Sequence, residues 1–252
     1  MNIISTPQIY ANIWEEESNQ FEALGLYSSL TNYLDSHSPN GKILEFGCGT
    51  GLATRHLAEN HEVLCLDNNI DLLEIAKKNL EKIPDKVQFH QCDFFELTEN
   101  DLTLIQNFAP DVVIGWNIGT CGQVQEERAS KHLNVVQKTK DYREKVEDII
   151  MKVSSDLESV KIVNLVIRSQ LNVGYNFEEA EKSQLENYNE YVFDINEKSK
   201  FKSKSAKALE WDNSSSNMNY VVHGSPSNLT IPLIISIVAE RKEELVDAEE
   251  QL

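Results

Sequence analysis

A glycine-rich turn with two nearby carboxylates is the part of this sequence best suited to bind a ligand. Gly47, Gly49 and Gly51 permit backbone conformations that other residues resist, and they let a ligand approach bare backbone. Glu45 precedes the turn. Asp67 follows it at about the 20-residue distance at which an acidic side chain accepts hydrogen bonds from a ribose diol. The spacing predicts a nucleotide-binding site.

Short predicted elements on either side hold this turn in place. Residues 42–46 form an apolar run typical of a buried strand. An amphipathic helix over residues 52–58 follows directly, and its first turn would direct free N–H groups at the contents of the loop. Residues 61–67 predict a second strand that ends at Asp67. Capping of the next helix is the alternative role for this carboxylate.

The kind of nucleotide follows from the details of the motif. The dinucleotide-binding fingerprint fits poorly, because its sixth position, here Leu52, should be Gly or Ala. The pattern from Glu45 to Gly51 instead resembles the first motif of the class I S-adenosylmethionine-dependent methyltransferases, and the resemblance covers roughly residues 40–240. It implies S-adenosylmethionine as cofactor, with Glu45 and the loop backbone, including Cys48, positioning its methionine end.

The resemblance continues after the second strand. Residues 68–79 are similar to the family's second helix, although Asn68 is polar where the family often has an apolar side chain against adenine. Residues 87–93 alternate like a third strand. By resemblance, Asp93 at its end accepts a hydrogen bond from the adenine amino group and Phe94 packs near the ring. Helix capping is again the alternative for Asp93.

The fourth predicted strand brings residues to the place where chemistry would occur. Residues 111–117 are apolar enough for a strand buried on both faces, and its carboxyl end would adjoin the cofactor crevice. Trp116 there either holds the sulfonium over its ring face or forms a bulky wall. Asn117 could present its amide to the acceptor or to the methionine carboxylate. His132 and His223 are candidate bases, with structural or surface roles as the alternative.

Residues 1–40 are expected to form a helical cap over the cofactor, as in many small-molecule enzymes of this family. Tyr10 and Trp14 would then line the cap and contact substrate, or else anchor the helix to the core.

The predicted fold is α/β and doubly wound, with a seven-stranded, mostly parallel sheet that ends in an antiparallel C-terminal hairpin. Residues 41–240 would form this cofactor-binding domain, residues 123–157 a helical insertion of two helices or one bent helix, and residues 241–252 an acidic tail. The hairpin region is expected to contain strands at 206–212, 220–223 and 229–240.

Charge restricts the partners. A net charge of −18 argues against generic nucleic-acid binding and favours small molecules or cationic partners. The run 198–207 holds five lysines and no acid. A solvated loop is the simpler interpretation, and attraction of an acidic or phosphorylated acceptor is the other.

The remaining features indicate an ordinary intracellular protein. The four cysteines lack metal-ligand spacing, so reduced core residues are expected and no metal site. No signal peptide and no apolar run of membrane-spanning length is evident, which predicts a cytoplasmic protein without a membrane partner.

The acceptor is inferred from what the sequence lacks. Residues 117–120 do not resemble the proline-rich tetrapeptide of amino-nucleobase enzymes, residues 117–125 lack the glutamate pair of protein-arginine enzymes, and no acidic cluster suggests a magnesium-assisted catechol site. We therefore expect methyl transfer to an N or O atom of a small metabolite or natural product. A protein or RNA methyltransferase that uses the 198–207 segment is an alternative, as is a non-catalytic cofactor-binding partner subunit.

Overall fold

The computed structural model describes residues 5–38, 40–172, 174–196, 198–214, 216–218 and 230–243. Its strands are β1 Gly41–Phe46, β2 His61–Asp67, β3 Val87–Gln91, β4 Val112–Trp116, β5 Ile162–Asn172, β6 Phe201–Glu210 and β7 Thr230–Arg241. They form one seven-stranded sheet in the order β3-β2-β1-β4-β5-β7-β6. Strands β1 to β5 pair in parallel, and β7 runs antiparallel to both of its neighbours. The predicted fold class is confirmed.

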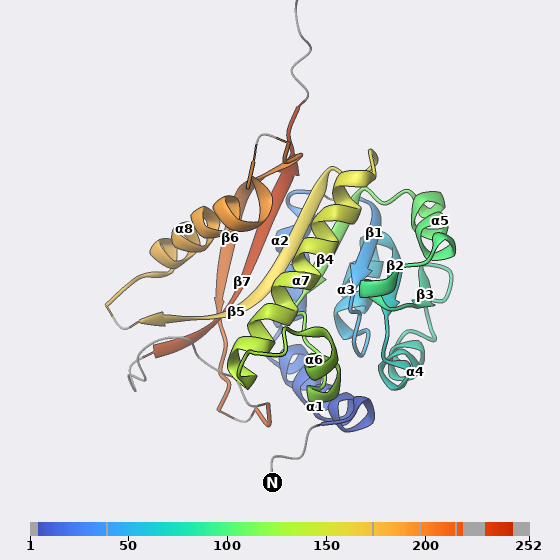
Figure 1. Ribbon diagram of the computed structural model, residues 1–252, viewed down its shortest axis with the longest axis horizontal. Helices are drawn as coiled ribbons and strands as arrows, with labels where there is room; N and C mark the ends of the chain where they lie inside the picture. The colour runs from blue at the N-terminus through green and yellow to red at the C-terminus, as the bar shows by residue number, and fades with distance from the viewer. Residues whose placement is uncertain are drawn as a thin grey trace, which may run out of the picture.

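Helices cover both faces of this sheet (Figure 1). They are α1 Pro7–Ala23, α2 Leu26–Asp35, α3 Leu52–Asn60, α4 Ile70–Asn79, α5 Glu99–Phe108, α6 Gly122–Arg128, α7 Val135–Asp156 and α8 Phe177–Tyr188, with a 3₁₀ turn at Phe94–Glu96 and a π turn at Asn189–Phe193. The predicted insertion is therefore two helices, α6 and α7. Within the described residues, every helix is too short or too polar to cross a lipid bilayer.

The two halves of the core follow from the alternation of side chains along each strand. In β1, Leu44 and Phe46 pack into one buried cluster with residues of α5 and α7, whereas Ile43 joins a second cluster with residues of α2 and α3. Successive side chains of a strand point to opposite faces, so a run of consecutive apolar residues fills both clusters. All five residues of β4 are buried for the same reason.

The lysine-rich segment differs from the prediction. From Phe201 onward it is the edge strand β6 rather than a solvated loop, and the strand begins there instead of at residue 206. Its pairing with the buried, apolar β7 explains this, since lysines suit the exposed side of an edge strand. Lys202 and Lys204 form ion pairs with Glu240, at 3.7 and 2.7 Å.

Three predictions fall outside the described residues. They are the strand at 220–223, the candidate base His223 and most of the acidic tail from residue 244 onward.

Candidate active site

The glycine turn after β1 adopts a backbone that only glycine fits well. Gly49 has φ of 55° and Gly51 has φ of 74°, both in the left-handed region. A Cβ atom on Gly49 would lie 2.5 Å from Nε1 of Trp14, and one on Gly51 would lie 2.8 Å from Cδ1 of Leu80. The turn therefore packs tightly against α1 on one side and against the end of α4 on the other.

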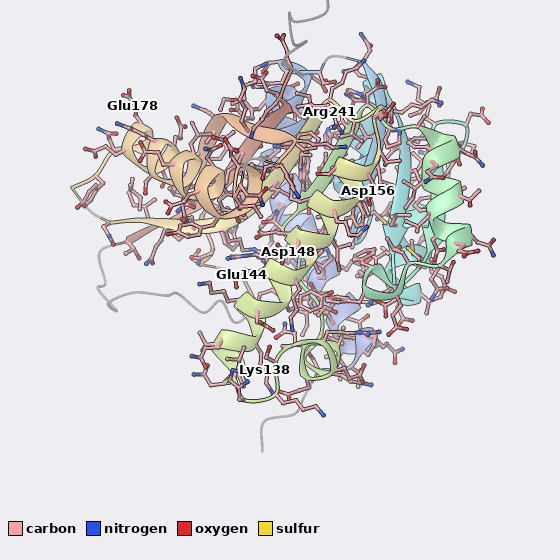
Figure 2. The ribbon with its side chains drawn as sticks, turned by 45° about the horizontal axis from the view of Figure 1, so that its top comes forward. Lys138, Glu144, Asp148, Asp156, Glu178 and Arg241 are labelled. Carbon is pink, nitrogen blue, oxygen red and sulfur yellow. The ribbon has the colours of Figure 1, made fainter. Side chains whose placement is uncertain are left out.

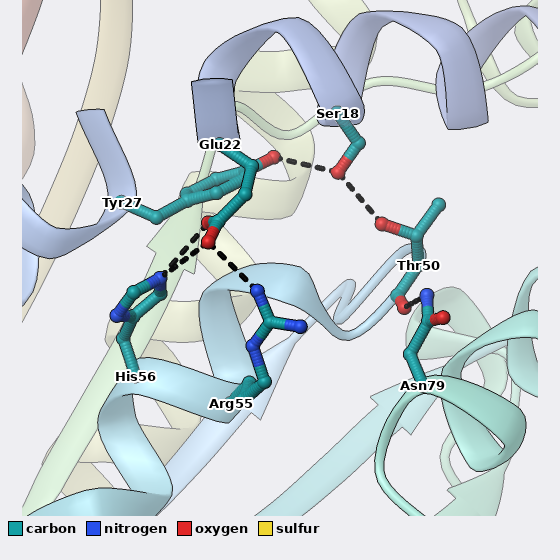
Figure 3. A network of polar contacts seen from close by, with 7 residues as sticks. All are labelled: Ser18, Glu22, Tyr27, Thr50, Arg55, His56 and Asn79. Carbon is teal, nitrogen blue, oxygen red and sulfur yellow. Dashed lines mark hydrogen bonds and ion pairs between the residues drawn. The ribbon is translucent and has the colours of Figure 1, made fainter. Parts of the chain in front are cut away.

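Side chains of α1 tie that helix to the turn (Figure 3). The Ser18 hydroxyl lies 2.6 Å from the Thr50 hydroxyl and 2.8 Å from that of Tyr27, and all three residues are buried. The Asn79 amide donates to the Thr50 carbonyl at 2.9 Å. Closer to solvent, Glu22 pairs with Arg55 at 2.7 Å and with the ring of a neighbouring histidine. These contacts fix α1 over the turn.

A first cavity of about 480 Å³ opens above the turn, at the carboxyl ends of β1, β2 and β4. Its lining residues are Tyr10, Trp14, Gly47, Gly49, Asp67, Asn68, Asn69, Leu72, Phe94, Trp116, Asn117, Ile118, Gly119, Thr120 and Tyr142. Among the described residues, the lining thus combines bare glycine backbone, aromatic walls and a single carboxylate, and it includes no basic side chain.

Asp67 is held at the floor of this cavity by the backbone. Its Oδ2 accepts the Gly49 N–H at 3.1 Å and its Oδ1 accepts the Asn69 N–H at 2.9 Å. Burial raises the pKa of Asp67 to about 6. Each oxygen keeps a further lone pair for a ligand hydroxyl. The side chain that caps α4 is Asn69, which accepts from the N–H groups of Asp71 and Leu72, so Asp67 remains available to a ligand.

A second cavity of about 1030 Å³ lies beside the first and shares part of its wall. Residues common to both cavities are Tyr10, Asn117, Ile118, Gly119 and Thr120. The rest of the second cavity is lined by Gly115, Gln125, Val136, Thr139, Lys140, Arg143, Glu147, Val166, Ile167, Arg168 and Met218. Val136, Lys140, Arg143 and Glu147 recur at helical spacing, so one face of α7 closes this cavity.

Asn117 stands in the shared wall with an unusual conformation. Its φ of 52° is left-handed, and its N–H donates to the Val166 carbonyl at 2.8 Å. Its side chain is 7% exposed, and its Oδ1 has no hydrogen-bond partner among the described residues. A buried amide oxygen without a partner is costly, and strained backbone of this kind gathers at functional sites. The geometry fits a ligand donor at this oxygen.

The methyltransferase-domain family matches residues 43–118, from β1 through the shared wall of the two cavities. Over that range the chain has the glycine turn, the buried carboxylate at the end of β2 and four parallel strands in the order β3-β2-β1-β4. This stretch of the chain thus matches a methyltransferase domain, with the glycine motif and strand arrangement of the class I S-adenosylmethionine-dependent type. The chain is accordingly an enzyme, and S-adenosylmethionine is its cofactor.

Several solved structures are similar to this methyltransferase, although distantly. One is a TehB-like methyltransferase from Corynebacterium glutamicum, with 18% identity, 92% of this chain and 98% of that one covered, and a TM-score of 0.47. Another is the magnesium protoporphyrin IX methyltransferase from Synechocystis, with 14% identity, 89% of this chain and 80% of that one covered, and a TM-score of 0.44. The 23S rRNA methyltransferase ErmE has 14% identity, 86% and 68% coverage, and a TM-score of 0.46. A search of the curated proteins gives no match. Nothing about the acceptor follows from these likenesses.

The first cavity fits the cofactor of this family. Asp67 offers two buried acceptor oxygens for a diol, and Gly47 and Gly49 expose backbone beside them. Asn68 and Phe94 both line the cavity, at the places where the sequence predicted adenine contacts. The absence of a basic side chain from the lining suits a cofactor that carries a sulfonium and an ammonium.

Trp116 also lines the first cavity and is rigidly held. Its Nε1–H donates to Oδ1 of Asn164 at 2.7 Å. The Asn164 amide in turn donates to the Ser236 hydroxyl at 2.8 Å and to the Ile237 carbonyl at 2.9 Å. This buried network links β4, β5 and β7 and fixes the indole in the cavity wall. Contact of the ring face with the sulfonium stays a prediction.

Two predicted carboxylates face away from the cavity lining. Glu45 accepts from the Thr54 hydroxyl at 2.7 Å and from the Cys65 thiol at 3.5 Å, and burial raises the pKa of Glu45 to about 7. Asp93 forms an ion pair with Arg128 and accepts the Phe95 N–H at 3.0 Å. Glu45 links β1 to α3 and β2, and Asp93 caps a short helical turn, so the direct contacts of both with the cofactor stay predictions.

The other predicted site residues fall into two groups. Tyr10 lines both cavities and Trp14 lines the first, which agrees with a substrate-facing cap. Cys48 is buried in the turn without lining either cavity, and His132 is exposed in the turn between α6 and α7, also outside both linings. The geometry thus gives no support to His132 as a base.

Sequence reasoning missed the basic residues of the second cavity. Arg168 comes directly after the mostly apolar run 162–167, and the carboxyl ends of parallel strands meet the site in a sheet of this kind. That signal was available. Arg143 and Lys140 carried none, because only the packing of α7 brings them to the cavity.

Proposed function

We propose that this enzyme transfers a methyl group to an N or O atom of a small molecule bound in the second cavity. The supporting observation is that the two cavities share the wall that contains Asn117 and Gly119. When bound, S-adenosylmethionine supplies a methyl group on a sulfonium that is open to in-line displacement. A wall common to both cavities is where a donor and an acceptor can meet.

The residues of the chain would act mainly by positioning. Asp67 would hold the ribose hydroxyls, and the rings of Trp14 and Trp116 would exclude water around the transferred group. Asn117 Oδ1 would accept a hydrogen bond from the N–H or O–H of the acceptor and so direct the acceptor's lone pair at the methyl carbon. The new bond to that carbon would replace its bond to sulfur, S-adenosylhomocysteine would leave, and the acceptor's proton would pass to solvent. Alignment of this kind can lower the activation free energy by roughly 7–11 kcal/mol. No histidine of the described residues lines either cavity.

Fractionated cell extract tests the proposal. The enzyme would be incubated with S-adenosylmethionine and either the small-molecule fraction or the protein and RNA fractions, and S-adenosylhomocysteine would be measured by mass spectrometry. We expect product only with small molecules, and its loss in Asp67→Ala and Asn117→Ala. Turnover confined to the protein or RNA fraction would overturn the proposal.

The alternative of a protein or RNA acceptor receives less support from the lysine-rich segment. Lys202 and Lys204 are paired with Glu240, and Lys207 lies 3.6 Å from Glu181. These charges are compensated locally. Neutralising Lys200, Lys202 and Lys204 together should leave turnover and its salt dependence unchanged; a large loss at low salt would favour the alternative.

A further inference from the structure

The lining of the second cavity reverses the charge balance of the whole chain. The chain has 41 acidic and 23 basic residues. Among the described residues, the charged side chains that line this cavity are three bases, Lys140, Arg143 and Arg168, and one acid, Glu147. In a protein that is otherwise strongly acidic, a cavity with this excess of positive charge attracts anions.

The other acids of α7 lie outside this cavity. Glu144 and Asp148, one turn apart on α7 in Figure 2, line a separate hollow between α7 and α8 instead. Lys140, Arg143 and Glu147 border both spaces. Lys140 is half exposed and lies 3.4 Å from Glu144. The two arginines therefore carry most of the positive charge that faces the cavity.

Arg168 is held in place by aromatic rings. Its guanidinium carbon lies 5.2 Å from the ring centre of Trp14, 5.9 Å from that of Phe21 and 6.0 Å from that of Trp211. Stacking on aromatic faces orients a guanidinium, and the planar fork of donors of a guanidinium matches the oxygens of a planar anion.

Arg143 approaches the cavity from the opposite element, α7. Its Nε is buried and has no hydrogen-bond partner among the described residues, although it lies 3.4 Å from Oε1 of Glu147. Glu147 already accepts the Tyr188 hydroxyl at 2.9 Å, and burial raises the pKa of Glu147. The one acid of the cavity is thus engaged by its own neighbours, while Arg143 retains an unused donor.

We propose that the second cavity binds an acceptor with a carboxylate or phosphate group, held by Arg143 and Arg168 while Asn117 faces the atom to be methylated. This inference rests on the proposed function for the identity of that cavity. Arginine suits the role because its fork of donors matches carboxylate and phosphate oxygens.

Four probes of similar size test the charge preference without requiring turnover. Benzoate, phenyl phosphate, benzamide and benzylamine would be titrated by ligand-observed NMR into enzyme saturated with S-adenosylhomocysteine. We expect benzoate or phenyl phosphate to bind at least about tenfold more tightly than the neutral and cationic probes. The relative affinities of the two anions identify the preferred group.

Variants assign the preference to the cavity. Arg143→Met and Arg168→Met should each abolish the preference for anionic probes. If the loss of Arg168 from its aromatic surroundings impairs folding, Arg143→Met alone still tests the inference. Lys152→Met removes the same charge from α7 at an exposed position paired with Asp156, and it should preserve the preference. Tighter binding of benzylamine, an anion preference that survives in Arg143→Met, or no binding of any probe at millimolar concentration would overturn the inference.

The outcome is distinguishable from failure of the proposed function. Anion binding that depends on Arg143, without methylation of any small molecule, would leave the inference standing and remove the proposed function. Methylation of neutral or cationic small molecules without anion binding would do the reverse.

Discussion

The two cavities share a wall, yet they differ in charge and in how the chain builds them. In the part of the chain that the structure describes, the first is lined by one carboxylate and no base, and its key contacts come from a glycine turn and strand ends within residues 45–69. The second is lined there by three bases and one acid, contributed by side chains of α7 and β5. This contrast supports our proposal that the first cavity favours a cationic cofactor and the second an anionic acceptor.

Substitutions in the two cavities should differ most in their effect on cofactor affinity, and Asp67 should show the largest effect. Asp67→Ala removes two charge-assisted acceptors, each worth about 1.5–3 kcal/mol, so we expect S-adenosylhomocysteine to bind at least ~100-fold more weakly. Arg143→Met should leave this affinity unchanged within about a factor of two. Calorimetric titration of both variants measures the difference. Equal losses in the two variants would break the comparison.

Substitution of Asn117 tests the wall between the cavities. Asn117→Gly keeps the left-handed backbone and removes the amide, and loss of one buried hydrogen bond of about 2 kcal/mol should reduce turnover ~30-fold. Asn117→Ala should lose as much activity and be about 1–2 kcal/mol less stable than Asn117→Gly, because alanine resists this φ and glycine does not. Steady-state kinetics and urea denaturation report the two effects. Unimpaired turnover in Asn117→Gly would exclude Asn117 from acceptor positioning.

The pKa of Asp67, about 6, predicts a pH dependence confined to the first cavity. Hydroxyl donors favour the ionised carboxylate, so S-adenosylhomocysteine should bind about tenfold more weakly at pH 5 than at neutral pH. Asp67→Asn should abolish this dependence. Calorimetry in buffers of different ionisation enthalpy should detect proton release below about pH 6. A flat profile in the unaltered enzyme would contradict the assignment.

Ionisation of Asp67 favours cofactor binding as the pH rises but lowers the stability of the fold. The pKa of Asp67 in the folded state lies above the unfolded value of about 3.9, so the folded protein binds more protons between these two values. The contribution of Asp67 to the free energy of unfolding therefore falls as the pH rises from about 4 to about 6. Asp67→Asn should remove that part of the pH dependence in urea denaturation.

The smallest effects are expected where α1 is tied to the turn. Ser18→Ala leaves the buried hydroxyls of Thr50 and Tyr27 short of a partner and should cost about 1–2 kcal/mol of stability. Glu22→Gln weakens part-exposed ion pairs and should cost less than about 1 kcal/mol. Urea denaturation ranks the two variants. A larger cost for Glu22→Gln would show that the exposed pairs, rather than the buried hydroxyls, hold α1.

The sequence predicted the fold and the first cavity because their signals are local. Alternating strands and helices determine the order of the sheet, and the glycine turn with Asp67 lies within one short stretch of chain. The prediction missed the start of β6 because a run rich in lysine resembles a solvated loop, and pairing with β7 is what stabilises the strand. The orientation of the Glu45 and Asp93 side chains was not predictable either. It depends on their partners Thr54 and Arg128, which tertiary packing brings near them.

The second cavity required the structure for a different reason. Arg143 and Arg168 lie on separate elements, and nothing in their sequence neighbourhoods marks them as partners. The left-handed backbone of Asn117 and the Asn164 network behind Trp116 likewise arise from tertiary contacts between β4, β5 and β7.

A crystal structure of the enzyme with S-adenosylhomocysteine tests the central claim most directly. The account predicts that the ribose hydroxyls contact the Asp67 carboxylate and that the sulfur lies at the wall beside Asn117, facing the second cavity. A ribose remote from Asp67, or an adenosyl group seated between Arg143 and Arg168, would contradict it.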